Sequence, residues 1–506
     1  MSGTTAKPQE DLQKAHTRRK NRESLLETLE SIVIAFVLAF IFRAFVVEAF
    51  VIPTGSMAPT LYGEHAEFRC SDCGYPFAVG VEASGISGEP LCPNCFKGQH
   101  LSDRVPKYSG DRILVLKYLY DFAEPRRWDV IVFHNPNDPS VNYIKRAVGL
   151  PGETIELVDG NVTINGRIVQ KTEEAQIALW MLVHDTRYKA TRQEWEPRWV
   201  IDPPWQGQDT GFVLDKPLGK DRTSWLAYRH RGPGGRLENI TDPYAYNSGG
   251  SSQRLGSQAV TDLCLRTAAT AGQAASVVVV EMRAYKDRFR FELTAQGSDQ
   301  PTRIFANDKV IARAPGGVLP VGCAASVLAA NVDHKLMLLV GGNRVATAAA
   351  AAETTPEGDP LYEPLRLSEA ERDRFDNPTG EEPRAMAAEV RVGARGGPVA
   401  LAYLRLDRDV YYLSRDPTGR ELVPGNATEG NPFTTHAGEY FVCGDNSPKS
   451  FDSRLWPSPD HPDLRPVVPR RNLVGKAFFV YWPAAGARYG VPVPVVPDVT
   501  GFRFVH

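Results

Sequence analysis

At 506 residues the chain is longer than a single hydrophobic core needs, so two or more domains are expected. Its formal net charge of −2 offers no electrostatic basis for nucleic-acid binding, and its 43 glycines and 39 prolines favour turns and short strands over a helical bundle. Seven cysteines, with four of them clustered, do not fit a disulfide-dense secreted scaffold.

An apolar segment near the start is the first predicted element. Residues 32–42 carry no charge, and after Arg43 the apolar character resumes through Val47. This length predicts a transmembrane anchor over 31–48, at the short end of the spanning range. The excess of Lys and Arg in residues 1–30 predicts a cytoplasmic tail, with everything after the anchor on the other side. A cleaved signal sequence is the alternative, because its uncharged core is equally short.

Short strands follow the anchor. Runs rich in β-branched residues and bounded by turn residues predict strands over 49–52, 110–119 and 128–133. Farther along, residues 155–158 and 162–164 flank Asp159-Gly160, which predicts a β-hairpin with a tight turn.

Four cysteines lie in a Gly- and Pro-rich segment over 68–102. Cys70 and Cys73 form one C-x-x-C pair and Cys92 and Cys95 form another, with eighteen residues between the pairs. This spacing predicts a zinc ribbon, and the role of the metal is structural because four thiolates leave no open coordination position. Two disulfides are the alternative if this side of the membrane is oxidising.

Residues 175–424 have a different character. Strand-like runs separated by Gly, Asp or Asn recur over 277–282, 288–293, 336–340, 389–392 and 410–413. This pattern resembles a concanavalin-like jelly-roll β-sandwich. Its aromatic residues suit either a sugar-binding face or ordinary packing, so a carbohydrate or a partner protein is a candidate ligand of this block.

Ser56 stands in a turn-forming run, PTGSMAPT over 53–60, a few residues past the apolar segment. A serine nucleophile needs an exposed position on a tight turn, with amide donors nearby for the developing oxyanion. Gly55 lets the backbone turn sharply and Pro53 restricts the entry. An ordinary serine in a Pro/Gly turn would look the same, so this run alone does not identify an enzyme.

Lys145 lies in a second run, YIKRAVGLPGE over 143–153. A lysine acts as a general base only where burial keeps its amine neutral near the working pH. Ile144, Ala147 and Val148 offer apolar surroundings, although a surface lysine on a strand is the alternative. A third run, GDNSPKSFDSR over 444–454, is dense in polar side chains whose hydrogen bonds can interlock; the alternative is a surface loop rich in Asx turns.

Together these runs resemble the bacterial type I signal peptidases, a family of Ser–Lys proteases. The anchor, the serine box, GDRILVLK over 110–117, the lysine box and the final box occur in the family order. The resemblance implies a mainly β chain with a signal-peptidase catalytic core over 49–67, 103–174 and 425–485. The zinc ribbon and the jelly roll are then insertions, and 486–506 is a C-terminal tail.

The resemblance also assigns roles by position. Ser56 corresponds to the nucleophile and Lys145 to the general base, while the Ser56 backbone N–H and the Thr54 hydroxyl form the oxyanion hole. Ser450 is expected to orient the lysine. The residues that further support the site are Asp445 and an ion pair formed by Asp452 and Arg454.

The implied activity is that of a membrane-bound serine endopeptidase that removes N-terminal signal peptides, with small residues at −1 and −3, from exported proteins. Catalysis needs no cofactor, and none of the ten histidines lies in the matched boxes, which argues against a Ser-His-Asp enzyme. The expected location is a cytoplasmic membrane, with a single span and the catalytic domain on the extracytoplasmic side. Its expected partners are signal peptides and the lipid bilayer.

Two alternatives remain open. One is a catalytically silent, membrane-anchored binding module that acts through the β-sandwich; it predicts a degraded dyad, yet Ser56, Lys145 and Ser450 are all present. The other is a related Ser–Lys self-cleaving regulator, but such proteins lack an N-terminal anchor and this order of boxes.

Overall fold

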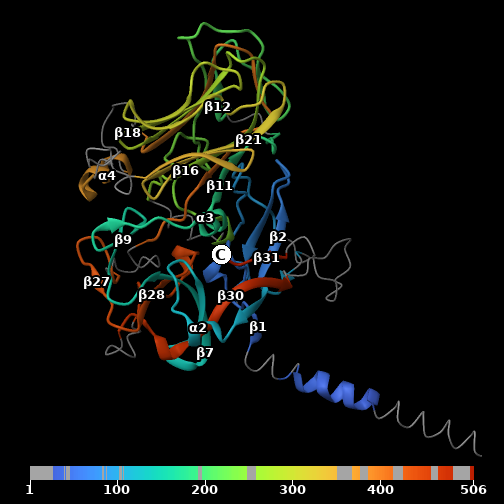
Figure 1. Cartoon of the computed structure of the whole chain (residues 1–506), viewed down its shortest axis with the longest axis vertical. Helices are drawn as coiled ribbons and strands as arrows, with labels where there is room; N and C mark the ends of the chain where they lie inside the picture. Colours follow the sequence, from blue (N-terminus) through green and yellow to red (C-terminus); the bar gives the residue numbers. More distant parts are fainter. Residues whose placement is uncertain are drawn as a thin grey trace, which may run out of the picture.

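The computed structural model describes residues 27–38, 40, 46–82, 85–86, 88–101, 105, 107–191, 197–247, 258–349, 367–376, 386–413, 425–456, 465–482 and 502–506. Over these residues the chain is mainly β, as predicted, and forms five sheets. In Figure 1 the strands around β12, β16, β18 and β21 make up the upper part of the molecule, and the sheet with β1, β7, β28 and β30 makes up the lower part.

The lower, eight-stranded sheet contains the strand that precedes the serine box and the strand that carries most of the lysine box. Its strands in spatial order are β1 (Val47–Val51), β5 (Arg112–Leu116), β30 (Leu473–Trp482), β6 (Val130–Asn135), β7 (Asp138–Gly149), β28 (Glu439–Cys443) and β29 (Val468–Pro469), with β31 (Arg503–Phe504) beside β30. Alternate residues of β6 enter different hydrophobic clusters: Val130 and Val132 pack with Ile113, whereas Ile131 and Phe133 pack with Val442. Because successive side chains of a strand point to opposite faces, this sheet is buried on both.

A four-stranded sheet follows the lysine box. It consists of β10 (Arg167–Ile168), β9 (Asn161–Ile164), β8 (Thr154–Val158) and β27 (Phe433–Thr434). The turn between β8 and β9 places Asp159 at φ 49° and Gly160 at φ 76°, as the tightest hairpin turns require. The predicted hairpin is therefore confirmed.

Two large antiparallel sheets form a β-sandwich from residues of the middle block. The nine-stranded sheet contains β13 (Gln206–Gly207), β14 (Phe212–Leu214), β25 (Val399–Leu401), β16 (Leu263–Ala271), β21 (Ala324–Val332), β22 (Lys335–Val340), β23 (Asn343–Ala349), β26 (Arg405–Arg408) and β11 (Met181–Asp185). The seven-stranded sheet contains β12 (Trp199–Ile201), β15 (Ser224–Tyr228), β24 (Ala388–Arg395), β17 (Val277–Ala284), β18 (Asp287–Thr294), β19 (Thr302–Ala306) and β20 (Lys309–Ala314). One hydrophobic cluster joins Leu265 and Leu338 of the first sheet to Val280 and Phe291 of the second.

Four of the five strand-like runs predicted in this block are strands, but 410–413 is not. These residues form a connection in which Val410 and Tyr412 are buried, and the backbone N–H groups of Tyr412 and Leu413 bond to groups outside any strand pairing. The Tyr412 N–H donates to the Gly160 carbonyl at 3.1 Å, and the Leu413 N–H donates to Ser447 Oγ at 2.8 Å. The segment thus fastens the hairpin to the final box.

The cysteine-bearing segment contributes a three-stranded sheet of β3 (Pro76–Gly80), β2 (His65–Arg69) and β4 (Lys107–Tyr108). Helical elements of the described chain include η1 (Gly55–Met57), α2 (Leu119–Phe122), α3 (Glu173–Leu179), η2 (Ala245–Asn247), α4 (Glu369–Asp376), η4 (Ser447–Lys449) and η5 (Arg470–Asn472). The boundary predicted at 174/175 falls inside α3, which Thr172 caps by accepting from the Ala175 N–H at 3.2 Å.

Both ends of the chain differ from the sequence-based boundaries. Residues 27–38 are helical, and none of the described helices is long and apolar enough to cross a lipid bilayer. Val47 and Glu48, assigned above to the anchor, already pair with β5 in β1. Of the predicted tail, 486–501 lies outside the described residues, whereas 502–506 adds β31 to the core sheet and buries Val505.

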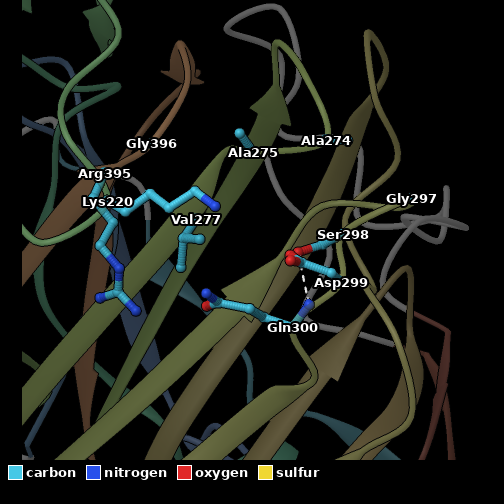
Figure 2. A pocket seen from close by; sticks show the side chains of 10 residues that line it. All are labelled: Lys220, Ala274, Ala275, Val277, Gly297, Ser298, Asp299, Gln300, Arg395 and Gly396. Atoms are coloured by element: carbon cyan, nitrogen blue, oxygen red, sulfur yellow. Dashed lines mark hydrogen bonds between the residues drawn. The ribbon is translucent and has the colours of Figure 1, made fainter.

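A pocket of about 180 Å³ opens in the sandwich (Figure 2). Lys220 and Arg395 extend into it beside Val277, across from the turn that carries Ser298. Ser298 Oγ accepts from the Gln300 N–H at 3.2 Å, and Arg395 reaches a carboxylate of β18 in an ion pair of 3.2 Å. Ser298 and Arg395 of this pocket are thus already engaged in contacts within the sandwich.

Lys171 fastens the four-stranded sheet to the sandwich. Its buried ammonium lies 2.6 Å from Asp333 and 2.7 Å from Asp409, and a third buried carboxylate, Asp262, belongs to the same cluster. Burial, then the neighbouring carboxylates, raise the pKa of Asp262 well above its usual range. The cluster is tolerated because Lys171 supplies the compensating charge.

We therefore expect Lys171→Met to destabilise the protein by about 3–5 kcal/mol, because it leaves buried carboxylates without a counter-charge. The measurement is urea unfolding followed by tryptophan fluorescence. The control is Arg288→Met, which removes an exposed ion pair to Asp308 and should change the free energy of unfolding by less than about 1 kcal/mol. Equal effects of the two substitutions would contradict the assigned role of Lys171.

Candidate active site

The turn that bears Ser56 follows β1 at once. The Ala58 N–H donates to the Gly55 carbonyl at 3.1 Å and the Leu61 N–H to the Met57 carbonyl at 2.9 Å, which closes the short helix η1. Met57 is fully buried in the cluster under the core sheet, whereas Ser56 is only half-buried. The buried methionine thus anchors the turn and leaves the serine hydroxyl accessible.

Lys145 reaches this hydroxyl from β7. In the sheet, Lys145 pairs with Ile131 of β6, and the residue is 4% exposed. Its Nζ donates to Ser56 Oγ at 2.8 Å and to the Ile144 carbonyl at 3.0 Å. The structure therefore brings together the two residues, 89 positions apart, that the sequence singled out for the chemistry.

Burial changes the acidity of this lysine. Desolvation disfavours the ammonium form and lowers the pKa of Lys145 from its ordinary value of 10.5 to about 8, and nearby Arg454 acts in the same direction. The carboxylates of Asp452 and Asp445 oppose the shift without cancelling it. The amine is consequently a usable proton acceptor at mildly alkaline pH.

A fully buried ion pair holds the strand of Lys145. Arg146 donates to both carboxylate oxygens of Asp445 at 2.7 Å and to the backbone carbonyls of Trp128 and His506, also at 2.7 Å. The pair forms because Arg146 lies opposite Cys443 in the sheet, two residues before Asp445. Asp445 therefore acts on the site through Arg146, next to the lysine.

The predicted ion pair of Asp452 and Arg454 is present and also buried. Arg454 donates to the two carboxylate oxygens at 2.8 and 2.7 Å, and the Gly444 N–H donates to Asp452 at 2.8 Å. Burial raises the pKa of Asp452, but Arg454, the Ser450 hydroxyl and the Gly444 N–H together lower it more, and the net shift is downward. This polar loop is an interlocked interior network rather than a surface loop.

Ser450 lies within this network, 2% exposed, but the described residues show no hydrogen bond between it and Lys145. Its hydroxyl lies close enough to Asp452 to help lower the pKa of that carboxyl. A Cβ at Gly444 would lie 2.2 Å from Ser450 Oγ and 2.5 Å from the Ser56 carbonyl oxygen. Glycine at 444 thus lets the Ser450 loop approach the serine turn.

Thr54 precedes η1 with an extended backbone, φ −122° and ψ 157°. Its side chain is exposed and does not cap the helix. The hydroxyl is therefore not committed to the turn, as an oxyanion donor requires.

The four predicted metal ligands come together. The Sγ atoms of Cys70, Cys73, Cys92 and Cys95 all lie within 4.8 Å of one another and are buried. Cys70 and Cys95 are 3.5 Å apart and Cys73 and Cys92 3.6 Å apart, close to the roughly 3.8 Å that separates thiolates at about 2.3 Å from a tetrahedral zinc. The Gln99 side-chain amide points an N–H at Cys70 Sγ, 3.5 Å away, as suits a thiolate.

Sequence reasoning missed two residues of this site. Arg146 could have been noticed as a charge within an otherwise apolar strand. Asn446 donates its side-chain amide to the Gly55 carbonyl at 2.9 Å and its N–H to the Ser56 carbonyl at 3.0 Å. Its position in the final box indicated a role, but its partner could be known only from the fold.

Comparison with protein families gives one match to these segments. The model described as "Signal peptidase, peptidase S26" matches residues 25–68, 101–200 and 398–482. The matched segments contain Ser56, Lys145 and the final box, and they omit the cysteine cluster and most of the sandwich.

Curated relatives agree with this match. Signal peptidase I of Rickettsia typhi is 29% identical over 154 residues, which cover 30% of this chain and 48% of the relative. Signal peptidase I of Rickettsia massiliae is 29% identical over 162 residues, covering 32% and 51%. The chain spans about half the length of the curated relatives it matches.

Among solved structures, the carbohydrate binding module CBM66 from Bacillus subtilis covers 42% of this chain and 95% of its own, with 8% identity and a TM-score of 0.25. So low a TM-score carries no weight for fold or function. The family model covers the segments that form the site. Over these three segments the chain is similar to the signal peptidase family, peptidase S26.

Proposed function

We propose that the protein is a type I signal peptidase, a serine endopeptidase in which Ser56 is the nucleophile and Lys145 the general base. The observation that carries the proposal is the 2.8 Å contact between Lys145 Nζ and Ser56 Oγ at a lysine that is 4% exposed. Nucleophile and base within hydrogen-bond reach, with the base held by further groups, is the arrangement that covalent catalysis needs.

The chemistry proceeds in two halves. The neutral Lys145 amine takes the proton of Ser56 Oγ as this oxygen attacks the scissile carbonyl carbon, and the oxyanion is stabilised by the Ser56 N–H and the Thr54 hydroxyl. The ammonium then returns the proton to the departing amide nitrogen, which leaves an acyl ester on Ser56. In the second half Lys145 deprotonates a water that hydrolyses the ester and restores the serine.

The substrates we propose are N-terminal signal peptides of exported proteins with small residues at −1 and −3. An extended peptide can add to β1, the terminal strand of the core sheet as described, and β1 leads directly into the Ser56 turn. The assembled Ser56–Lys145 pair leaves the alternative of a silent binding module without support.

The bilayer is the second proposed partner. The proposed single-pass anchor begins at residue 31 and ends before β1, which already contains Val47 and Glu48. A cytoplasmic tail over 1–30 precedes it, with the catalytic part on the extracytoplasmic side. Within the described helix, Val33, Phe36 and Leu38 are 58–61% exposed, so the described residues leave most of their apolar surface uncovered. Lipid is the environment that such side chains favour.

For the rest of the chain we propose two insertions into the peptidase: a structural zinc ribbon over 68–102 and a concanavalin-like jelly roll over 175–424. The four buried, mutually close thiols suit a tetrahedral zinc. One hydrophobic core shared by two antiparallel sheets suits the jelly roll, and a carbohydrate or a protein is its proposed ligand.

Ser56→Ala should lower the rate of precursor cleavage by at least about 10³-fold, because no other oxygen replaces the nucleophile. The assay incubates detergent-solubilised protein with a precursor that carries Ala at −1 and −3. Ser140→Ala is the control, since this exposed serine of β7 bonds only to Asp138 in the described contacts. Undiminished cleavage by Ser56→Ala would refute the assignment.

The pH dependence of kcat/KM should follow the Lys145 amine. Below its pKa of about 8 the group is an ammonium and cannot accept a proton, so kcat/KM should rise with pH through a midpoint near that value. Initial rates at low precursor concentration between pH 6 and about 10 provide the measurement. A flat profile across this range would contradict Lys145 as base.

Purified protein should contain one zinc per chain, measured by elemental analysis together with a thiol count under denaturing conditions. Cys92→Ser should lose the metal because it removes one of four ligands. Cys264→Ser, at a buried thiol of the sandwich outside the cluster, should keep it. No zinc and no titratable thiols among the four would instead establish disulfides.

A further inference from the structure

A short segment of the middle block lies against the Ser56 turn. Asn247, at the end of η2, exchanges two side-chain hydrogen bonds with Asn446, each of 2.7 Å. Both residues are buried, at 6% and 0% exposure. Asn247 lies between the second and third segments that match the peptidase family, so this contact comes from outside the matched domain.

Asn446 connects Asn247 to the turn that carries Ser56. Its side-chain amide divides its two N–H groups between the Asn247 side chain and the Gly55 carbonyl, while its backbone N–H donates to the Ser56 carbonyl at 3.0 Å. Asn247 therefore sets the rotation of the amide that holds the serine turn. Without Asn247, one donor and one acceptor of Asn446 would lack their partners in a buried place.

The neighbouring Tyr246 restrains the same turn from another side. A Cβ at Gly55 would lie 2.1 Å from Cε1 of the Tyr246 ring, so the ring touches the glycine directly. The ring stacks on Tyr62 at 5.5 Å between centroids, and its hydroxyl donates to the Glu64 carbonyl at 3.3 Å. Tyr246 is thus held in place and blocks movement of the turn toward it.

We propose that Tyr246 and Asn247 form a clamp, contributed by the inserted block, that positions Ser56 for Lys145. The effect on catalysis rests on the proposed peptidase function, whereas the clamp itself only restricts the mobility of the turn. A reactive oxygen displaced by about 1 Å can lose about 10²-fold in rate, so the clamp acts on the chemical step rather than on substrate binding. Asn247 and Tyr246 are positioning residues, since neither contacts the reacting atoms.

The test compares Asn247→Leu with a matched variant, Asn239→Leu, in the full-length protein. Asn239 is also a buried asparagine of the block, 4% exposed, but it bonds to the backbone of Phe375 and Ala387. Amide hydrogen–deuterium exchange is followed in peptides that cover 54–61 and 444–447. Steady-state cleavage of the Ala-containing precursor supplies kcat, KM and the pH profile.

We expect Asn247→Leu to accelerate exchange in both peptides by about tenfold or more, as the loss of about 1.4 kcal/mol of restraint would do. We also expect kcat to fall by about tenfold or more with KM nearly unchanged and the acid limb of kcat/KM unmoved, because Lys145 stays buried. Asn247→Asp, which still accepts from Asn446, should lie between the wild type and Asn247→Leu. Asn239→Leu should leave exchange and kcat at wild-type values.

Unchanged exchange in Asn247→Leu would overturn the clamp whatever the activity. Equal losses in the two Leu variants would also overturn it, because they would reveal general destabilisation. Faster exchange in Asn247→Leu, together with a wild type that cleaves no precursor, would instead uphold the clamp and refute the proposed peptidase function.

Discussion

A lysine amine held away from water beside a serine hydroxyl is the constraint on which the rest of the site depends. Desolvating an ammonium group is costly, and at Lys145 this cost lowers the pKa of the amine. The neutral amine, unlike the ammonium, can accept a proton. The opposing carboxylates of Asp445 and Asp452 are each bound by an arginine, Arg146 and Arg454. This pairing limits their attraction for the Lys145 ammonium, so that the pKa of Lys145 stays low, as the proposed general-base role requires.

The same constraint explains why distant parts of the chain meet at this point. The serine turn follows β1, the lysine lies on β7, and the final box follows β28, which pairs with β7. The last residues of the described chain close the network, since the His506 carbonyl accepts from Arg146. Tyr246 and Asn247 of the middle block contact Gly55 and Asn446, so this block is joined to the site by contact and not only by sequence.

Local patterns in the sequence predicted a good part of this arrangement. The Asp159-Gly160 hairpin, most of the sandwich strands and the grouping of the four cysteines follow from turn chemistry, β-branched runs and C-x-x-C spacing, which act over few residues. The boxes around Ser56, Lys145 and Asp452 could be identified through their joint resemblance to the type I signal peptidases, because each run alone has an ordinary structural alternative.

Long-range partners could not be predicted in this way. Nothing near Asn247 indicates that it meets Asn446, because that contact depends on how the sandwich docks on the core. The run at 410–413 has strand-like composition but serves as a buried connection, and 502–506 looks like a tail until it pairs with β30. Each of these outcomes is decided by tertiary packing, which overrides local preference.

The most direct test of the account is to titrate the Lys145 amine itself. Nuclear magnetic resonance of protein labelled with ¹³C at lysine Cε reports each amine separately, and the Lys145→Arg variant identifies the signal. We expect a midpoint near pH 8 for this residue. A Lys145 midpoint at the ordinary lysine value of about 10.4 would contradict its role as the base.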